Sequence, residues 1–213
     1  MPGRAIPLVT GEYYHLFNRG SDKRKVFLQP RDYTRFLQTL NYYQFQDTKP
    51  KFSHRFNYKL KSLKLSLDNK LVNFICYCLM PNHFHLLVQQ LKEKGISIFV
   101  SQLLNSYTKY FNTKYKRVGH LFQSTFKSVR IENEEQLLHV SRYIHLNPIV
   151  SEIAKDLDNY PWSSYHEYVR GPKICSTEEI LRSFSSKEVY KQFLDDQIDY
   201  GKSLEQIKHQ IIE

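Results

Sequence analysis

The chain has 213 residues and a formal net charge of +10 at pH 7, with 31 Lys and Arg against 21 Asp and Glu. The length suits one domain with extensions, and the charge favours a polyanionic partner such as nucleic acid over a merely basic, soluble surface. No stretch approaches the roughly 20 apolar residues of a membrane span, and the N-terminal segment lacks the apolar run of a signal peptide. The three cysteines argue against a disulfide framework, so we expect no membrane partner and a reducing, cytoplasmic compartment.

A strand and a helix are predicted first. Residues 12–18 alternate and are rich in aromatic side chains, which predicts a strand that ends before Gly20. Residues 30–45 carry apolar side chains at helical spacing, with Pro30 suited to the first turn. The Lys- and Arg-rich stretch at about 47–70 has no firm periodicity. We interpret it as a basic insertion, either a solvated loop or an arm that contacts nucleic acid.

Two histidines then stand one residue apart in an apolar run. The runs at 72–79 and 84–88 predict two strands, joined by a tight turn at 81–82. Because residues i and i+2 of a strand point to the same face, His83 and His85 project together, away from the core. Two adjacent imidazoles suit the first ligands of a divalent metal ion. A hydrogen-bonded core histidine, a general base and a phosphate contact are the alternatives.

The first strand of this hairpin carries two cysteines, Cys76 and Cys78, on one face. Cys78 could approach His83 across the turn, which makes a Cys/His zinc site an alternative. The spacing matches no established zinc pattern, however, and burial as small apolar side chains is the expected role.

A long helix and a fourth strand follow. Apolar residues at helical spacing predict a helix over residues 95–115, with Gly119 near its end. Residues 121–131 alternate and predict a strand, whose rim Lys127 and Arg130 could line.

A tyrosine-bearing helix is predicted to begin at Asn133, with Gln136 as a capping partner. By the 3.6-residue period, Tyr143 lies on the flank of the buried stripe, and Asn147 shares its side one turn later. Because a proline disfavours helical geometry at the residue before it, this helix should end at Asn147, before Pro148.

The order of these elements, β-α-β-β-α-β, predicts an α+β domain with a ferredoxin-like antiparallel sheet. The tyrosine-bearing helix is added to that plan. We place the domain at residues 1–170, with the basic insertion at about 47–70. Residues 171–213 are polar and helical in pattern, which predicts a C-terminal extension.

Five segments carry a resemblance to a known family. They are Tyr-His-Leu-Phe-Asn-Arg-Gly at 14–20, Met-Pro-Asn-His-Phe-His-Leu-Leu at 80–87, Gly-His-Leu-Phe-Gln-Ser-Thr-Phe-Lys-Ser at 119–128, Arg-Tyr-Ile-His-Leu-Asn-Pro at 142–148 and Tyr-Pro-Trp-Ser-Ser-Tyr at 160–165. In this order they resemble the REP-associated tyrosine transposases, the insertion-sequence-200-like group of the single-tyrosine "HUH" (histidine–hydrophobe–histidine) transposases. The family pattern usually has Trp where Phe122 stands, and the exchange keeps an aromatic ring.

The resemblance implies metal-dependent cleavage of single-stranded DNA and strand transfer, in DNA transposition or in the processing of repeat hairpins. Tyr143 would be the nucleophile that forms a 5′-phosphotyrosine intermediate and releases a 3′-hydroxyl. His83 and His85 would hold Mg²⁺ or Mn²⁺. A third ligand is expected at Asn147, which could equally serve as a helix C-cap.

The resemblance implies single-stranded or hairpin DNA as the partner of a monomer or homodimer. Arg19, Lys127 and Arg130 are candidate DNA contacts by charge and placement. Aromatic residues make up 15% of the chain, and aromatic side chains among basic ones suit a single-stranded ligand, although most will lie in the core. Two alternatives remain open: a nucleic-acid-binding module of the same fold without catalysis, and a Cys/His zinc protein.

Overall fold

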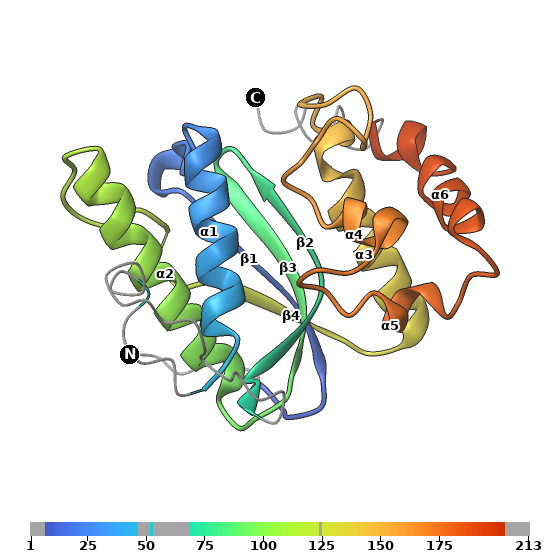
Figure 1. Cartoon of the computed structure of the whole chain (residues 1–213), viewed down its shortest axis with the longest axis horizontal. Helices are drawn as coiled ribbons and strands as arrows, with labels where there is room; N and C mark the ends of the chain where they lie inside the picture. Colours follow the sequence, from blue (N-terminus) through green and yellow to red (C-terminus); the bar gives the residue numbers. More distant parts are fainter. Residues whose placement is uncertain (1–6, 47–51, 53–68, 124, 203–213) are drawn as a thin grey trace.

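A computed structural model describes residues 7–46, 52, 69–123 and 125–202 (Figure 1). Most of the basic insertion predicted at 47–70 lies outside the described residues, as does the end of the predicted extension, residues 203–213. The strands are β1 (Tyr13–Arg19), β2 (Val72–Met80), β3 (His83–Gln90) and β4 (Lys127–Ile131). The helices are α1 (Pro30–Tyr43), α2 (Gly95–Lys114), α3 (Glu134–Val150), α4 (Tyr165–Arg170), α5 (Glu178–Leu181) and α6 (Lys187–Asp195), with a short 3-10 helix at Ser21–Lys23.

The four strands form one antiparallel sheet in the order β2-β3-β1-β4. Along the chain, α1 separates β1 from β2, a tight turn joins β2 to β3, and α2 separates β3 from β4. The mixed α/β architecture and its antiparallel sheet are therefore as the sequence predicts. The two strands of the hairpin, β2 and β3, contribute buried side chains to the cores on both faces of the sheet, which explains their nearly continuous apolar runs.

Two hydrophobic cores lie on opposite faces of the sheet. α1 and α2 cover one face, where Phe84 and Leu86 of β3 are fully buried. α3 and the C-terminal helices cover the other face, to the right in Figure 1, and pack on Leu87. The alternation of side chains along β3 thus supplies both cores, and it leaves its two histidines on the α3 side.

The fourth strand is shorter than predicted, because β4 begins at Lys127 rather than at residue 121. β4 pairs regularly with β1 as far as Lys127 opposite Phe17, whereas the next bridge joins Phe122 to Gly20. Between these two bridges the β1 side advances by three residues, from Phe17 to Gly20, whereas the β4 side spans five, from Phe122 to Lys127. Because of this difference of two residues, the ladder of β1 and β4 does not continue in register to the bridge between Gly20 and Phe122, and β4 does not include residues 121–123.

The prediction that α3 ends at Asn147 is wrong, since the helix continues through Pro148 to Val150. Proline lacks only its own N–H donor, and the next turn is closed by the backbone N–H of Ser151, which donates to the carbonyl of Asn147 at 3.0 Å. Pro148 and Ile149 are buried. Burial of this apolar turn offsets one missing hydrogen bond so close to the end of the helix.

The C-terminal helices pack directly on α3. Tyr190 and Leu194 of α6 are fully buried in the same core as Ile144. The hydroxyl of Tyr190 lies 2.6 Å from Nδ1 of His145, and Nε2 of His145 lies 2.8 Å from the hydroxyl of Ser164. α6 therefore helps to fix the helix that carries Tyr143. Each helix of the described ranges falls short of the combined length and apolar character that a membrane span requires.

The burial of His145 predicts a loss of stability in mild acid. Burial lowers its pKa to about 3, so below the usual pKa of 6.5 only the unfolded chain takes up this proton. The contribution of His145 to the free energy of unfolding is therefore fully present above pH 6.5, and it falls by about 1.4 kcal/mol per pH unit as the pH drops toward 3. At pH 5, His145 should lower the free energy of unfolding by about 2 kcal/mol relative to neutral pH. Urea unfolding between pH 7.5 and 5 measures how the free energy of unfolding depends on pH. His145→Gln should reduce this slope by about 1.4 kcal/mol per pH unit, which corresponds to one proton. An unchanged slope would contradict a buried, neutral His145.

Candidate active site

One face of the sheet carries the histidines that the sequence singles out. His83 and His85 lie on the α3 side of β3, whereas Phe84 points into the core under α1 and α2. β1 runs antiparallel beside β3, with Phe17 opposite His85 and Arg19 opposite His83. Directly paired residues project to the same face, so these two residues of β1 lie beside the histidines.

A third histidine, His15 of β1, joins the other two. Its Nε2 lies 2.9 Å from Nδ1 of His85 in a buried hydrogen bond, and the two rings stack with centroids 5.1 Å apart. The ring of His83 lies edge-on to that of His85 at 4.9 Å, and its Nδ1 lies 2.6 Å from Oδ1 of Asn82. The two imidazoles of β3 are thus oriented through the same ring nitrogen, Nδ1.

Tyr143 stands over this cluster from α3. The side chain of Asn133 caps the start of that helix, as predicted, by accepting a hydrogen bond from the backbone N–H of Gln136 at 2.8 Å. The ring of Tyr143 meets His85 edge-to-face with centroids 5.4 Å apart, and it meets His15 in the same way at 6.0 Å. The side chain is 46% exposed, so the phenol is supported by the histidines and remains accessible to a large ligand.

Burial keeps the supporting histidines neutral. It lowers the pKa of His85 well below 6.5, and the neighbouring His83 and His15 lower that pKa further. Burial alone lowers the pKa of His15 to about 4. At neutral pH both side chains are therefore uncharged imidazoles, the form in which histidine binds metal ions.

The donor set fits a metal ion only in part. Within the described ranges, no three His, Cys, Asp or Glu side chains are grouped so that they could hold one. His83 and His85 would need an oxygen donor beside them, and Asn147, buried one turn after Tyr143 on the same side of α3, carries an amide oxygen. Cys78 pairs with His85 in the ladder rather than approaching His83. Its side chain is fully buried and its thiol donates to the sulfur of Met80 at 3.7 Å, so the structure does not favour the zinc alternative.

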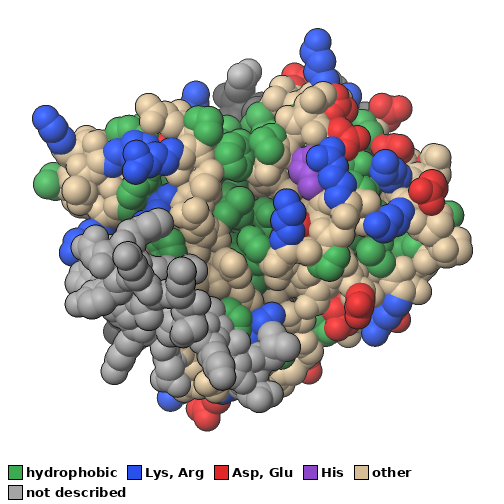
Figure 2. Space-filling model, viewed as in Figure 1, with side chains coloured by type: hydrophobic (Ala, Val, Ile, Leu, Met, Phe, Trp, Pro, Cys, Tyr) green, Lys and Arg blue, Asp and Glu red, His purple; other side chains and the backbone are tan. Residues whose placement is uncertain are grey.

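The three basic residues predicted to contact DNA do not share one face. Arg19 and Lys127 are exposed on the face of the histidines, since Arg19 pairs with His83 and Lys127 pairs with Phe17. Arg130 pairs with Tyr14, whose side chain points into the other core, and it forms a 3.0 Å ion pair with Glu12. In Figure 2, most of the acidic side chains in view lie over α3 and the C-terminal helices, to the right.

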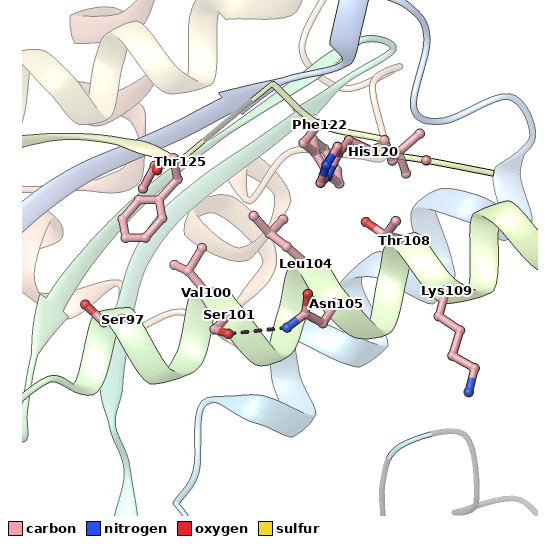
Figure 3. Close-up of a pocket in the computed structure, with 13 residues that line it drawn as sticks. Ser97, Val100, Ser101, Leu104, Asn105, Thr108, Lys109, His120, Phe122 and Thr125 are labelled. Carbon is pink, nitrogen blue, oxygen red and sulfur yellow. Dashed lines mark hydrogen bonds between the residues drawn. The ribbon is translucent and has the colours of Figure 1, made fainter. Parts of the chain in front are cut away.

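A separate hollow of about 500 Å³ lies between α2 and residues 119–122 and 125–126. Ser97, Ser101 and Asn105 form a polar stripe on its α2 wall, and Phe122 belongs to the opposite wall (Figure 3). None of the predicted catalytic, metal or DNA-contacting residues lines this hollow. It is therefore distinct from the cluster around Tyr143.

The sequence predictions assigned no role to His15 or Phe17. A signal was present, because strict alternation in residues 12–18 puts both residues on the strand face opposite to Tyr14 and Leu16. What the sequence could not reveal was the register that brings this strand beside β3.

The chain matches known proteins in both sequence and fold. The family described as transposase IS200 like matches residues 9–147, which is more than half of the chain. A curated relative, named as a REP-associated tyrosine transposase of Haemophilus influenzae, is 26% identical over 107 residues, covering 45% of this chain and 60% of that protein. The chain therefore spans less than two thirds of that relative's length. The chain belongs to the family of IS200-like transposases.

A solved structure shares the fold. It is the structure of a REP-associated tyrosine transposase bound to a REP hairpin, with a TM-score of 0.53 and 16% sequence identity. The match covers 80% of this chain and 86% of the other. At this identity the likeness concerns the fold, and it extends beyond the segment that the family matches.

Proposed function

We propose that the chain is a metal-dependent endonuclease and strand transferase that acts on single-stranded or hairpin DNA through Tyr143. The observation that carries the proposal is the position of Tyr143, exposed to solvent and in ring contact with the buried, neutral His85. Family membership and the solved relative bound to a REP hairpin support a hairpin substrate. From the element order and the strand order β2-β3-β1-β4, we also infer the ferredoxin-like plan.

The proposed reaction is a transesterification. The phenolic oxygen of Tyr143 forms a bond to phosphorus and loses its proton, while the bond from phosphorus to the 3′-oxygen breaks and that oxygen takes up a proton. The products are a 5′-phosphotyrosine and a free 3′-hydroxyl. Because the covalent link conserves the energy of the phosphodiester, strand transfer needs no ATP. Another 3′-hydroxyl would lose its proton and bond to the phosphorus, while the bond from phosphorus to the oxygen of Tyr143 breaks and the phenol regains its proton.

A phenol has a pKa near 10, so this nucleophile needs activation. His83 and His85 would hold Mg²⁺ or Mn²⁺, and the amide oxygen of Asn147 would complete the protein's ligands. The ion would polarise a non-bridging oxygen of the scissile phosphate. Two imidazoles with one amide oxygen are softer than the all-oxygen ligand sets that Mg²⁺ prefers, so Mn²⁺ should support activity better in vitro.

A covalent-adduct assay tests this function. The protein is mixed with labelled single-stranded hairpin DNA and Mn²⁺ or Mg²⁺, then denatured and separated by mass. We expect a labelled band at the mass of the protein plus a DNA fragment, and we expect EDTA to remove it. Tight, salt-sensitive DNA binding without an adduct under any divalent ion would instead indicate a binding module without catalysis.

Phe17 should contribute to DNA binding by stacking. Its ring is half-buried beside His15 and His85, with centroids 5.1 and 6.0 Å away, on the face that also carries Lys127. A base stacked on an aromatic ring contributes about 1–3 kcal/mol, so Phe17→Ala should weaken single-stranded DNA binding by roughly 5- to 150-fold. Fluorescence anisotropy measures the change. Val129→Ala, which shortens an exposed apolar side chain on the same face, is the matched control and should bind nearly normally.

A further inference from the structure

His15 makes contacts that the proposed reaction leaves unexplained. It is 9% exposed and lies between two functional side chains, hydrogen-bonded to His85 and in edge contact with Tyr143. A buried polar ring can be merely structural. In this case, however, its partner atom belongs to an imidazole whose proton position decides whether that imidazole can act as a ligand.

We propose that His15 is a positioning residue that accepts the Nδ1–H of His85 and thereby directs the Nε2 lone pair of His85 toward a divalent cation. The inference rests on the proposed function, since it assigns a role within the same site. Neutral imidazole carries a single N–H. When Nδ1 of His85 is the donor, its Nε2 is the basic nitrogen. When His15 donates instead, the proton of His85 sits on Nε2, which then cannot bind a cation.

The second ligand of the pair supports this direction. Nδ1 of His83 lies 2.6 Å from Oδ1 of Asn82, and an amide oxygen can only accept a hydrogen bond. The orientation of that amide is fixed in turn, because its Nδ2 donates to the carbonyl of Lys23 at 3.3 Å. In its neutral form, His83 therefore carries its proton on Nδ1 and leaves Nε2 as the basic nitrogen. For the two ligands of β3 to act as a pair, His85 must hold its proton on Nδ1 too, with His15 as its acceptor.

Because both rings are buried, the hydrogen bond between His15 and His85 determines which nitrogen of His85 carries the proton. His85 is 5% exposed and His15 is 9% exposed, so bulk water does not readily replace this acceptor. The register of β1 and β3 brings the two rings into the stacked arrangement that holds the 2.9 Å contact. Groups that fix a ligand histidine in this way commonly change metal affinity by about 10- to 100-fold.

The first experiment determines which ring nitrogen of His85 and of His15 carries the proton in the wild-type protein without metal. Long-range ¹H–¹⁵N NMR of the histidine rings distinguishes the two neutral forms. We expect His85 to be protonated on Nδ1 and His15 to show an unprotonated, hydrogen-bonded Nε2. Protonation of His85 on Nε2 would overturn the inference, whatever the catalytic activity proves to be.

The second experiment compares two replacements of His15 by calorimetric titration with Mn²⁺. His15→Phe keeps a ring and removes the acceptor, whereas His15→Gln offers an amide oxygen. We expect Mn²⁺ binding to be about 10- to 100-fold weaker in His15→Phe and most of the affinity to be recovered in His15→Gln. Equal Mn²⁺ affinity in all three proteins would overturn the inference. Absence of Mn²⁺ binding to the wild type would instead count against the proposed function, and the NMR result would still decide the role of His15.

Discussion

Replacing Tyr143 with Phe should abolish covalent attachment to DNA and leave DNA affinity almost unchanged. The substitution removes one hydroxyl oxygen, the atom proposed to attack phosphorus, and keeps the ring that packs against His85 and His15. Loss of a nucleophile lowers the rate by a factor on the order of 10⁴ or more, which places the adduct below detection. Because the side chain is 46% exposed, stability and DNA binding should each change by less than about 0.5 kcal/mol. A denaturing gel and an anisotropy titration measure the two properties.

Other tyrosines supply the controls. Tyr110 and Tyr115 are unsuitable nucleophiles in the fold, because their hydroxyls donate to the carboxylate of Asp32 at 2.9 and 2.7 Å. Tyr200 is 62% exposed near the C-terminal end of the described chain, so Tyr200→Phe tests whether any exposed phenol can form the adduct. It should react normally. An adduct that persists in Tyr143→Phe would show that the nucleophile is misassigned.

The local parts of the fold could be predicted from the sequence. Period-two alternation placed His83 and His85 on one face, and the structure has them on the α3 side of β3. The cap at Asn133 follows from the hydrogen-bonding capacity of one short side chain. These features depend on a few neighbouring residues, for which backbone geometry sets the side-chain directions.

The parts that could not be predicted depend on distant contacts. His15 joins the site only because β1 pairs with β3, and the sequence does not reveal the register between strands 70 residues apart. The end of α3 was misplaced for a similar reason. Local preference at Pro148 favoured termination, but burial of the last turn against the second core outweighs that preference. Local rules therefore located the residues of this chain, whereas tertiary packing decided which of them meet.

Loss of Asp32 should destabilise the fold strongly. It lies at the start of α1 with its side chain fully buried. Its carboxylate accepts hydrogen bonds from the backbone N–H groups of Leu28 and Gln29. It also accepts hydrogen bonds from three side chains at the C-terminal end of α2, those of Tyr110, Lys114 and the C-cap residue Tyr115. A single carboxylate thus joins the two helices that cover one face of the sheet. Asp32→Ala leaves these donors without their acceptor and should cost roughly 3–5 kcal/mol.

Urea unfolding of Asp32→Ala and of a matched control measures this cost. Glu12→Ala removes an ion pair with Arg130 in which both side chains are partly exposed, so it should cost less than about 1 kcal/mol. Similar losses in the two variants would contradict the role of Asp32.

The pH dependence of stability tests the same carboxylate independently. Burial raises the pKa of Asp32, but the hydrogen bonds from Lys114, Tyr115, Leu28 and Tyr110 outweigh it and leave the pKa below its ordinary value. The stabilisation is therefore complete above the unfolded-state pKa of about 3.9 and is lost as the pH falls through the lower folded-state value. In the wild type, the contribution of Asp32 to the free energy of unfolding should be lost as the pH falls from about 4 to the pH at which the protein unfolds in acid. Asp32→Ala should not show this loss. A variant with the same acid slope as the wild type would show that the carboxylate is not held by charge-assisted hydrogen bonds, and that its contribution to stability lies in packing alone.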